Sequence, residues 1–250
     1  MIPNPIRKVL STLTTRQVQY LLMGGQACVL YGGAEFSRDT DIVLFAEAAN
    51  VSRLSQALLD LRAEVIAVPP FDVQYLDRGL AIHFRCHCDN DAEMRLDVMS
   101  RLRDLSPFAE LWQRRVSIAF PDGGTCELLS LPDLVQAKKT QRDKDWPMIR
   151  RLIESDYARH SEHATADQLA FWLKECRTPE ILMELARAFP AESARMQVKR
   201  PLLSFAAAQE LEPLETALLA EQEVERARDR EYWRPLRAEL EQLRLQRRKN

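Results

Sequence analysis

The sequence has no apolar run that approaches the roughly 20 residues needed for a membrane-spanning helix. Its first residues, Met1-Ile2-Pro3-Asn4-Pro5, lack the charged segment and apolar core of a secretory signal peptide. The five cysteines are an odd number and follow no disulfide-framework spacing, which favours a reducing compartment. Together these absences predict a cytoplasmic protein that does not enter the membrane.

The chain also has little net charge, because 35 basic and 37 acidic side chains nearly cancel to −2. A protein that binds nucleic acid through its overall electric field is usually basic. Binding of nucleic acid would therefore depend on a local patch. The basic residues that could form such a patch are Arg101, Arg103, Arg114, Arg115, Lys138, Lys139, Arg142 and Lys144.

The hydrophobic pattern changes near residue 130. Before it, strands are predicted at 18–23, 40–45, 65–68, 80–88, 94–100, 116–120 and 125–129. Helices are predicted there at 5–17, at 27–31, from Asn50 as its cap to about Leu61, and at 106–115. Asp89-Asn90-Asp91 and Asp122-Gly123-Gly124 are the expected hairpin turns.

After Pro132 the strand signals stop. Helices are predicted at 132–143, 147–159, 165–176, 179–189 and 213–246, several of them beginning at a proline. At 250 residues the chain is long enough for two modest domains. The sequence therefore predicts an α+β domain at 1–130 and an all-helical domain at 131–250.

Carboxylates gather on two of the predicted strands. Asp39 and Asp41 lie in Asp39-Thr40-Asp41-Ile42-Val43-Leu44, and alternation along a strand points both to the same face. Two adjacent carboxylates repel each other unless a cation lies between them. Magnesium is the natural cation, because it accepts carboxylate and phosphate oxygens together. Asp97, charged among apolar neighbours on a later strand, is expected to join them.

A pair of glycines precedes the first two aspartates. Gly24 and Gly25 follow a predicted strand and open a predicted helix, with thirteen residues between Gly25 and Asp39. Glycine lets the backbone approach phosphates closely, and a helix N-terminus presents free N–H groups. The turn is therefore a candidate cradle for the phosphates of a nucleoside triphosphate.

This order of glycines and aspartates resembles the nucleotidyltransferase superfamily, in particular its AbiEii-type branch of type IV toxin–antitoxin toxins and their relatives. Gly24, Gly25, Asp39, Asp41 and Asp97 fall on its motif positions. In that branch a helix carrying a lysine, followed by Arg-x-Lys-Asp, comes after the metal-binding strands. This chain has Lys138-Lys139 and then Arg142-Asp143-Lys144-Asp145. The likeness covers roughly residues 19–155, and it leaves the choice between Lys138 and Lys139 open.

The resemblance implies a nucleotidyltransferase fold, a mixed sheet with flanking helices, and a magnesium-dependent enzyme that uses two ions. It would transfer a nucleoside monophosphate from an NTP to an acceptor hydroxyl. Asp39 and Asp41 would bind the metal on the triphosphate, and Asp97 would hold the second metal or accept a proton. Gly24, Gly25 and Lys138 would bind the nucleotide, whereas Lys139 and Arg142 would also offset charge as pyrophosphate leaves.

The same resemblance makes RNA, in particular the 3′ end of tRNA, an expected acceptor and an antitoxin protein an expected partner. A small molecule such as an aminoglycoside, or a protein side chain, is an alternative acceptor. A catalytically silent module that binds a nucleotide or a partner is an alternative of another class. The oligomeric state and the preferred base are not determined by the sequence.

Two other groups of polar residues have simpler interpretations. His83, Cys86, His87 and Cys88 suggest zinc, but on a strand the histidines and the cysteines face opposite sides. Asp145 is interpreted as the cap of the helix that starts near Pro147, not as a catalytic residue.

Overall fold

The computed structural model describes residues 4–88, 92–120 and 124–249. Contacts between Cα atoms divide the chain into two compact units. The first unit contains residues 1–30, 35–137 and 232–250, and the second contains residues 31–34 and 138–231. The division near residue 137 lies close to the domain boundary predicted at residue 130. Residues 232–250, which the sequence assigned to the helical domain, group instead with the first unit.

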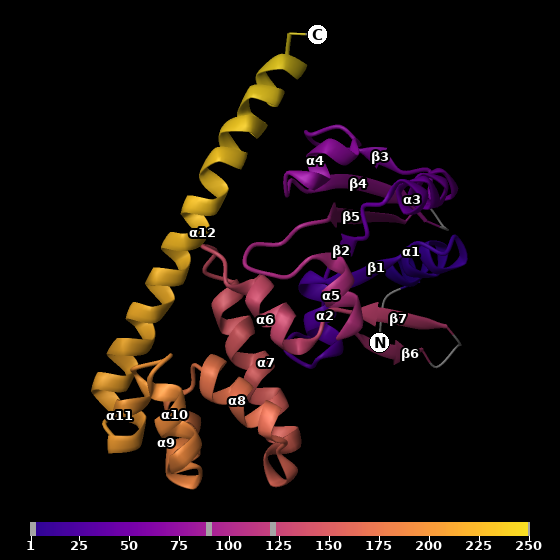
Figure 1. Ribbon diagram of the computed structural model, residues 1–250. Coiled ribbons are helices and arrows are strands. Elements are labelled where there is room, and N and C mark those ends of the chain that lie inside the picture. Colours follow the sequence, from indigo (N-terminus) through magenta and orange to yellow (C-terminus); the bar gives the residue numbers. More distant parts are fainter. Residues whose placement is uncertain (1–3, 89–91, 121–123, 250) are drawn as a thin grey trace. The chain divides into compact units, whose positions relative to one another are not determined.

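A seven-stranded mixed sheet forms the first unit's centre, with the strand order β3-β4-β5-β2-β1-β7-β6 (Figure 1). The strands are β1 (Tyr20–Met23), β2 (Asp39–Leu44), β3 (Glu64–Val65), β4 (Ile82–His87), β5 (Glu93–Met99), β6 (Val116–Ala119) and β7 (Thr125–Leu128). β2 runs parallel to β5, and β1 runs parallel to β7; the other neighbours are antiparallel. The predicted α+β class, a mixed sheet with flanking helices and a helical C-terminal stretch, is confirmed.

Several helices of the described residues accompany the sheet, in addition to the last part of α12 (Leu211–Arg247). They are α1 (Asn4–Thr15), α2 (Gly24–Leu30), α3 (Ala48–Asp60), α4 (Val73–Asp77), α5 (Phe108–Gln113) and α6 (Leu131–Lys138). α1 packs against α3 and β5. The short α4 was not predicted, because five residues are too few to show a helical period.

The two faces of strands β4, β5 and β2 differ in chemistry. One face is buried and, apart from Thr40, apolar; it includes Ile42, Leu96 and Ile82. On the other face most side chains are polar and half-buried or exposed, and the apolar Val43 and Met99 lie at its end. This follows from the alternation of side chains along each strand. The apolar face supplies the core, which leaves the polar face available for a site.

The second unit is helical. It contains α7 (Asp145–His160), α8 (Ala166–Glu175), α9 (Pro179–Ala188), α10 (Pro190–Gln197), α11 (Leu203–Ala208), a 3-10 turn at Ser161–His163 and the first part of α12 (Leu211–Arg247). Thr165 and Gln168 form a capping box at the start of α8, close to where the helix is predicted. The sequence did not predict α10 and α11. In the described ranges, no helix is both long and apolar enough to cross a membrane.

Two predicted turns cannot be compared with the structure. Residues 89–91 and 122–123 lie outside the described residues. The strands that flank them do pair as expected: β4 is antiparallel to β5, and β6 is antiparallel to β7.

The prediction for Asn50 was wrong. α3 begins at Ala48 with Glu47 at its N-cap position, so Asn50 lies inside the helix. Its side chain is 1% exposed and accepts from the backbone N–H of Gln19 at 2.8 Å. The Asn50 amide also donates to the carbonyl oxygens of Gln19 at 2.9 Å and Phe45 at 2.8 Å. Asn50 therefore ties α3 to the residue before β1 and the residue after β2.

Replacing Asn50 by Ala should destabilise the protein by about 2 kcal/mol or more. The substitution leaves two half-buried backbone groups, the N–H of Gln19 and the carbonyl of Phe45, without the side chain that they bind, and each orphaned group costs roughly 1–3 kcal/mol. Urea denaturation followed by circular dichroism would measure the loss. Gln56→Ala, at an exposed position of the same helix, is the control and should change stability by less than about 0.5 kcal/mol. Equal stability of the two variants would contradict a bridging role for Asn50.

Candidate functional site

The structure brings the three predicted metal-binding aspartates onto one face of two adjacent strands. Asp41 on β2 is the direct register partner of Asp97 on β5, and Asp39 is the partner of Arg95. Neighbouring strands lie about 4.8 Å apart, and register partners point to the same face. All three carboxylates are half-buried. The sheet pairing therefore concentrates negative charge where the sequence placed a metal site.

Gly24 lies directly against this cluster. β1 ends at Met23, which pairs with Asp41, and Gly24 follows with a φ of +68°. A Cβ atom on Gly24 would lie 1.9 Å from Oδ2 of Asp41, whereas one on Gly25 would meet Oγ of Ser37 at 2.6 Å. Only glycine fits at position 24, because any side chain there would displace the Asp41 carboxylate.

Asp97 is held by two cationic or polar neighbours. Its Oδ1 accepts from Nε of Arg95 at 2.8 Å, and Nδ1 of His83 lies 2.8 Å from the same oxygen. Burial is the largest single influence and raises the pKa of Asp97, but the hydrogen bonds with His83 and Arg95 outweigh it, so the pKa is lowered. Asp97 is therefore a carboxylate at neutral pH.

Arg95 interacts electrostatically with all three aspartates. Its hydrogen bond to Asp97 is the largest cause of a raised pKa, and the charges of Asp39 and Asp41 raise the pKa further. The guanidinium thus acts as an internal counter-ion for three carboxylates. Neither Arg95 nor His83 was assigned this role from the sequence. The predicted hairpin of β4 and β5 could have indicated the role of His83, because the pairing of these strands makes His83 the register partner of Asp97.

The donor set fits a hard divalent cation in its chemistry, because three carboxylates share one face. In the observed conformation the fit is incomplete, since Oδ1 of Asp97 is occupied by Arg95 and His83. Within the part of the chain that the structure describes, no three His, Cys, Asp or Glu side chains are grouped so that they could hold a metal. Asp97 could join Asp39 and Asp41 as a ligand only after a rearrangement of these side chains.

The predicted nucleotide-binding residues Lys138, Lys139 and Arg142 belong to the second unit. Nζ of Lys139 lies 2.7 Å from Glu175. Lys138 and Arg142 both bind Asp145, at 3.2 Å and 2.8 Å. Both lysines are buried, so their charges are compensated by carboxylates of their own unit. Their proposed contact with a triphosphate stays a prediction.

The interpretation of Asp145 as a helix cap was wrong. α7 starts at Asp145 itself, and Lys144 at the N-cap position makes no capping hydrogen bond. The Asp145 carboxylate is 1% exposed and accepts from Oγ1 of Thr140 at 2.6 Å as well as from Lys138 and Arg142. It thereby organises the turn between α6 and α7.

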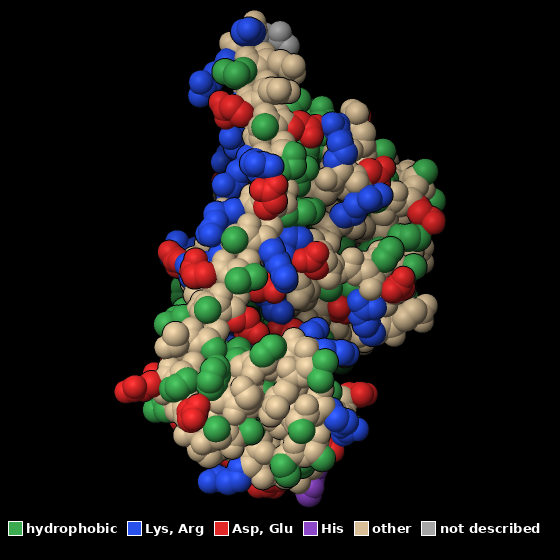
Figure 2. Space-filling model, turned by 60° about the vertical axis from the view of Figure 1, so that its left-hand side comes forward, with side chains coloured by type: hydrophobic (Ala, Val, Ile, Leu, Met, Phe, Trp, Pro, Cys, Tyr) green, Lys and Arg blue, Asp and Glu red, His purple; other side chains and the backbone are tan. Residues whose placement is uncertain are grey.

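The basic patch predicted from the sequence is largely neutralised. Besides the three residues of the second unit, Arg114 binds Asp133 through two hydrogen bonds, and Arg115 binds Glu127. Arg103 binds Asp104. A different basic surface is present on the part of α12 that belongs to the first unit (Figure 2). Its exposed members are Arg234, Arg237, Arg244, Arg247 and Arg248, of which Arg244 pairs with Glu241 at 3.2 Å.

The faces predicted for the histidines and cysteines of β4 are confirmed. Cys86 and Cys88 are buried, whereas His83 and His87 are half-buried on the polar face. Burial raises the pKa of the Cys86 thiol to about 12. This cysteine is therefore a protonated core residue.

No protein-family model matches the sequence, and no curated protein is significantly similar to it.

Replacing Gly24 by Ala should destabilise the protein by roughly 1–3 kcal/mol, because it combines a strained positive φ with a clash against Asp41. Gly25→Ala is the matched control, and its loss should be smaller because the end of the Ser37 side chain can move. Urea denaturation of the two variants would measure the difference. A Gly24→Ala protein as stable as Gly25→Ala would show that the backbone does not press on Asp41.

Replacing Asp145 by Asn should cost about 3 kcal/mol at neutral pH, because it leaves the buried Lys138 without its ion pair. Burial, the largest influence, raises the pKa of Asp145, but Lys138, Thr140 and Arg142 outweigh it and the pKa is lowered. The folded state therefore binds this proton less readily than the unfolded state.

The stability difference between the wild type and Asp145→Asn should thus be constant from pH 5 to 7 and should shrink as the pH falls below about 4. Chemical denaturation at several pH values would measure it. Asp143→Asn, at a side chain that is 91% exposed, should change stability little at any of these pH values. A difference that persisted unchanged at pH 3 would contradict the ionised state of Asp145.

Proposed function

We propose that the first unit carries a magnesium-dependent nucleotidyltransferase site, which transfers a nucleoside monophosphate from an NTP to an acceptor hydroxyl. The observation that supports this most directly is the register of Asp41 with Asp97 on adjacent parallel strands, with Asp39 on the same face. The close packing of Gly24 on Asp41 adds a second motif residue to the same place. The spacing of these residues is that of the superfamily that the sequence resembles.

Each side chain has a distinct task in this proposal. Asp39 and Asp41 would hold the magnesium that accompanies the triphosphate, and Asp97 would complete the ligand set or accept the proton of the acceptor hydroxyl. Bound magnesium would supply positive charge to the phosphates and to the leaving pyrophosphate. Arg95 keeps the cluster compensated when no metal is bound. Lys138, Lys139 and Arg142 stay candidates for contact with the nucleotide, although their present partners are carboxylates.

RNA is the acceptor that we favour. The resemblance implies it, and the exposed arginines of α12 provide a local basic surface in a chain of nearly neutral total charge. Phosphates of a nucleic acid would be bound by such a surface through charge alone. An antitoxin partner and a cytoplasmic location are proposed on the resemblance only.

A catalytically silent binding module is the second candidate. The observation that favours it is the engagement of Oδ1 of Asp97 by both Arg95 and His83. If these contacts persist when nucleotide binds, Oδ1 of Asp97 stays occupied, and only Oδ2 is left to bind a metal or to accept a proton. The variant Asp97→Asn separates the two candidates: an enzyme should lose turnover and keep part of its nucleotide binding, whereas a binding module should keep its partner binding in full.

Calorimetric titration of each of the four NTPs, with and without magnesium, tests the site itself. We expect wild-type binding to weaken at least tenfold without magnesium, which is about 1.4 kcal/mol. The Asp39→Asn/Asp41→Asn variant should lose this dependence because it lacks the first pair of ligands.

The control variant removes the same two negative charges at positions far in sequence from Asp39 and Asp41. Asp77→Asn/Asp104→Asn replaces two exposed aspartates of the same unit and should bind as the wild type does. NTP binding that is independent of magnesium, or magnesium-dependent NTP binding that persists in the Asp39→Asn/Asp41→Asn variant, would contradict the proposal. Where binding is established, pyrophosphate release with labelled NTP and total RNA would identify the acceptor.

A further inference from the structure

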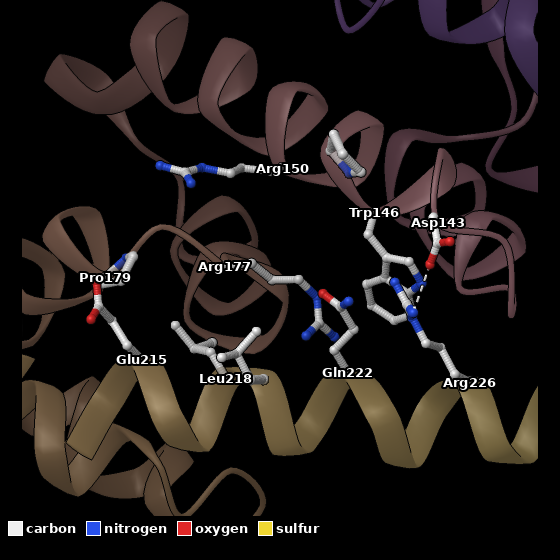
Figure 3. Close-up of a pocket in the computed structure, with 11 residues that line it drawn as sticks. Asp143, Trp146, Arg150, Arg177, Pro179, Glu215, Leu218, Gln222 and Arg226 are labelled. Carbon is white, nitrogen blue, oxygen red and sulfur yellow. Dashed lines mark ion pairs between the residues drawn. The ribbon is translucent and has the colours of Figure 1, made fainter. Parts of the chain in front are cut away.

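The second unit contains a cavity of about 520 Å³ that no residue of the carboxylate site lines (Figure 3). Its walls come from α7, from the segment that leads into α9, and from α12. The lining includes Arg150, Arg177 and Arg226, the aliphatic Leu218 and Leu219, and the carboxylate of Glu215. The cavity therefore combines several guanidinium groups with an apolar wall.

Arg177 is the unusual member of this lining. Its side chain is only 8% exposed, and its guanidinium lies between Leu218 and Trp146, beside Gln222 (Figure 3). Burial is the main influence on its pKa and lowers it. A buried arginine normally has acceptors for its N–H groups, because an unsatisfied buried charge is costly.

The acceptors available to Arg177 are incomplete. NH1 lies 3.2 Å from Oε2 of Glu221, but both oxygens of Glu221 already accept hydrogen bonds from Arg200, at 3.0 Å and 2.9 Å. Of the described residues, none accepts a hydrogen bond from Nε or NH1 of Arg177. The remaining contact is with the ring of Trp146, 4.7 Å from the guanidinium carbon. Nε and NH1 are themselves closed off from solvent, so what Arg177 presents to the cavity that it lines is a positive charge only partly compensated by the shared Glu221.

The neighbouring walls indicate what kind of group fits. Arg226 also lies over the Trp146 ring, at 5.8 Å, and its NH1 pairs with Asp143 at 2.8 Å (Figure 3). Because two guanidiniums contact this buried ring, it offers little free surface on which a nucleotide base could stack. Leu218 and Leu219 provide aliphatic surface instead. The complementary ligand has an anionic group and an aliphatic body.

We propose that this cavity binds a small amphipathic anion, with its carboxylate or phosphate group at Arg177 and its aliphatic body against Leu218 and Leu219. The negative group would compensate the charge of Arg177 at the edge of the guanidinium that faces the cavity, where a charge-assisted hydrogen bond is strong. Displacement of water from the aliphatic wall would add to the affinity. This site is independent of the proposed nucleotidyl transfer and could be present in an enzyme or in a binding module.

Calorimetry on the full-length protein with four probes tests the proposal. The probes are hexanoate, hexyl phosphate, hexanol and inorganic phosphate. We expect hexanoate or hexyl phosphate to bind at least tenfold more tightly than hexanol and inorganic phosphate, because only these probes combine both features. The tighter of the two identifies the headgroup. Equal binding of hexanol, or no binding of either amphipathic probe at millimolar concentration, would overturn the proposal.

Variants locate the binding. Arg177→Gln should abolish it, and thermal unfolding would show whether this variant is folded. Leu219→Glu is a second test that spares the fold, because Leu219 is 64% exposed; a negative charge there should weaken anion binding at least tenfold. Arg151→Gln changes an exposed arginine of α7 that does not line the cavity, and it should bind as the wild type does. Unchanged affinity in a folded Arg177→Gln protein, or in Leu219→Glu, would refute the assignment.

Discussion

Repulsion among Asp39, Asp41 and Asp97 is the constraint around which the first unit is arranged. The parallel pairing of β2 with β5 puts these carboxylates side by side, and such an arrangement is stable only when positive charge lies close by. In the observed conformation Arg95 supplies that charge. A divalent cation would supply it more strongly, and would have to compete with Arg95 for Asp97. The polar face of the sheet is thus compensated without metal and has the donors to bind one.

In the second unit, buried charges are compensated by ion pairs. Lys138 and Asp145 compensate each other, as do Lys139 and Glu175, and these pairs keep charge inside a helical core where an isolated ion would be costly. Arg177 differs, because the carboxylate nearest to it is shared with Arg200. Asp145 is shared too, by Lys138 and Arg142, but Arg177 also lines a cavity, and this is what sets it apart from the buried pairs.

Much of the fold follows from local patterns. The strands were predicted because apolar residues alternate or run together over four to seven positions, as at Ile42 and Leu44, and the burial of these side chains agrees. The long helices were predicted from helical spacing and from prolines at their first turns. The elements that were missed, α4, α10 and α11, have five to eight residues, too few for the helical period to stand out. Asn50 and Asp145 were misjudged because Asn and Asp serve both as helix caps and as buried hydrogen-bonding residues. Only the hydrogen-bond partners in the folded structure distinguish the two roles.

By itself, the sequence determined the α+β class, the face on which Asp39 and Asp41 lie, and the composition of a candidate metal site. These properties depend on residue type and on the two-residue period of a strand, which are local. Tertiary structure alone decided that Asp41 lies beside Asp97, that His83 and Arg95 bind Asp97, and that Lys138 and Lys139 have buried partners. It alone also brought Arg177, Trp146 and Leu218 around one cavity. Such contacts depend on strand register and on helix packing between segments far apart in the chain, and no local pattern encodes them.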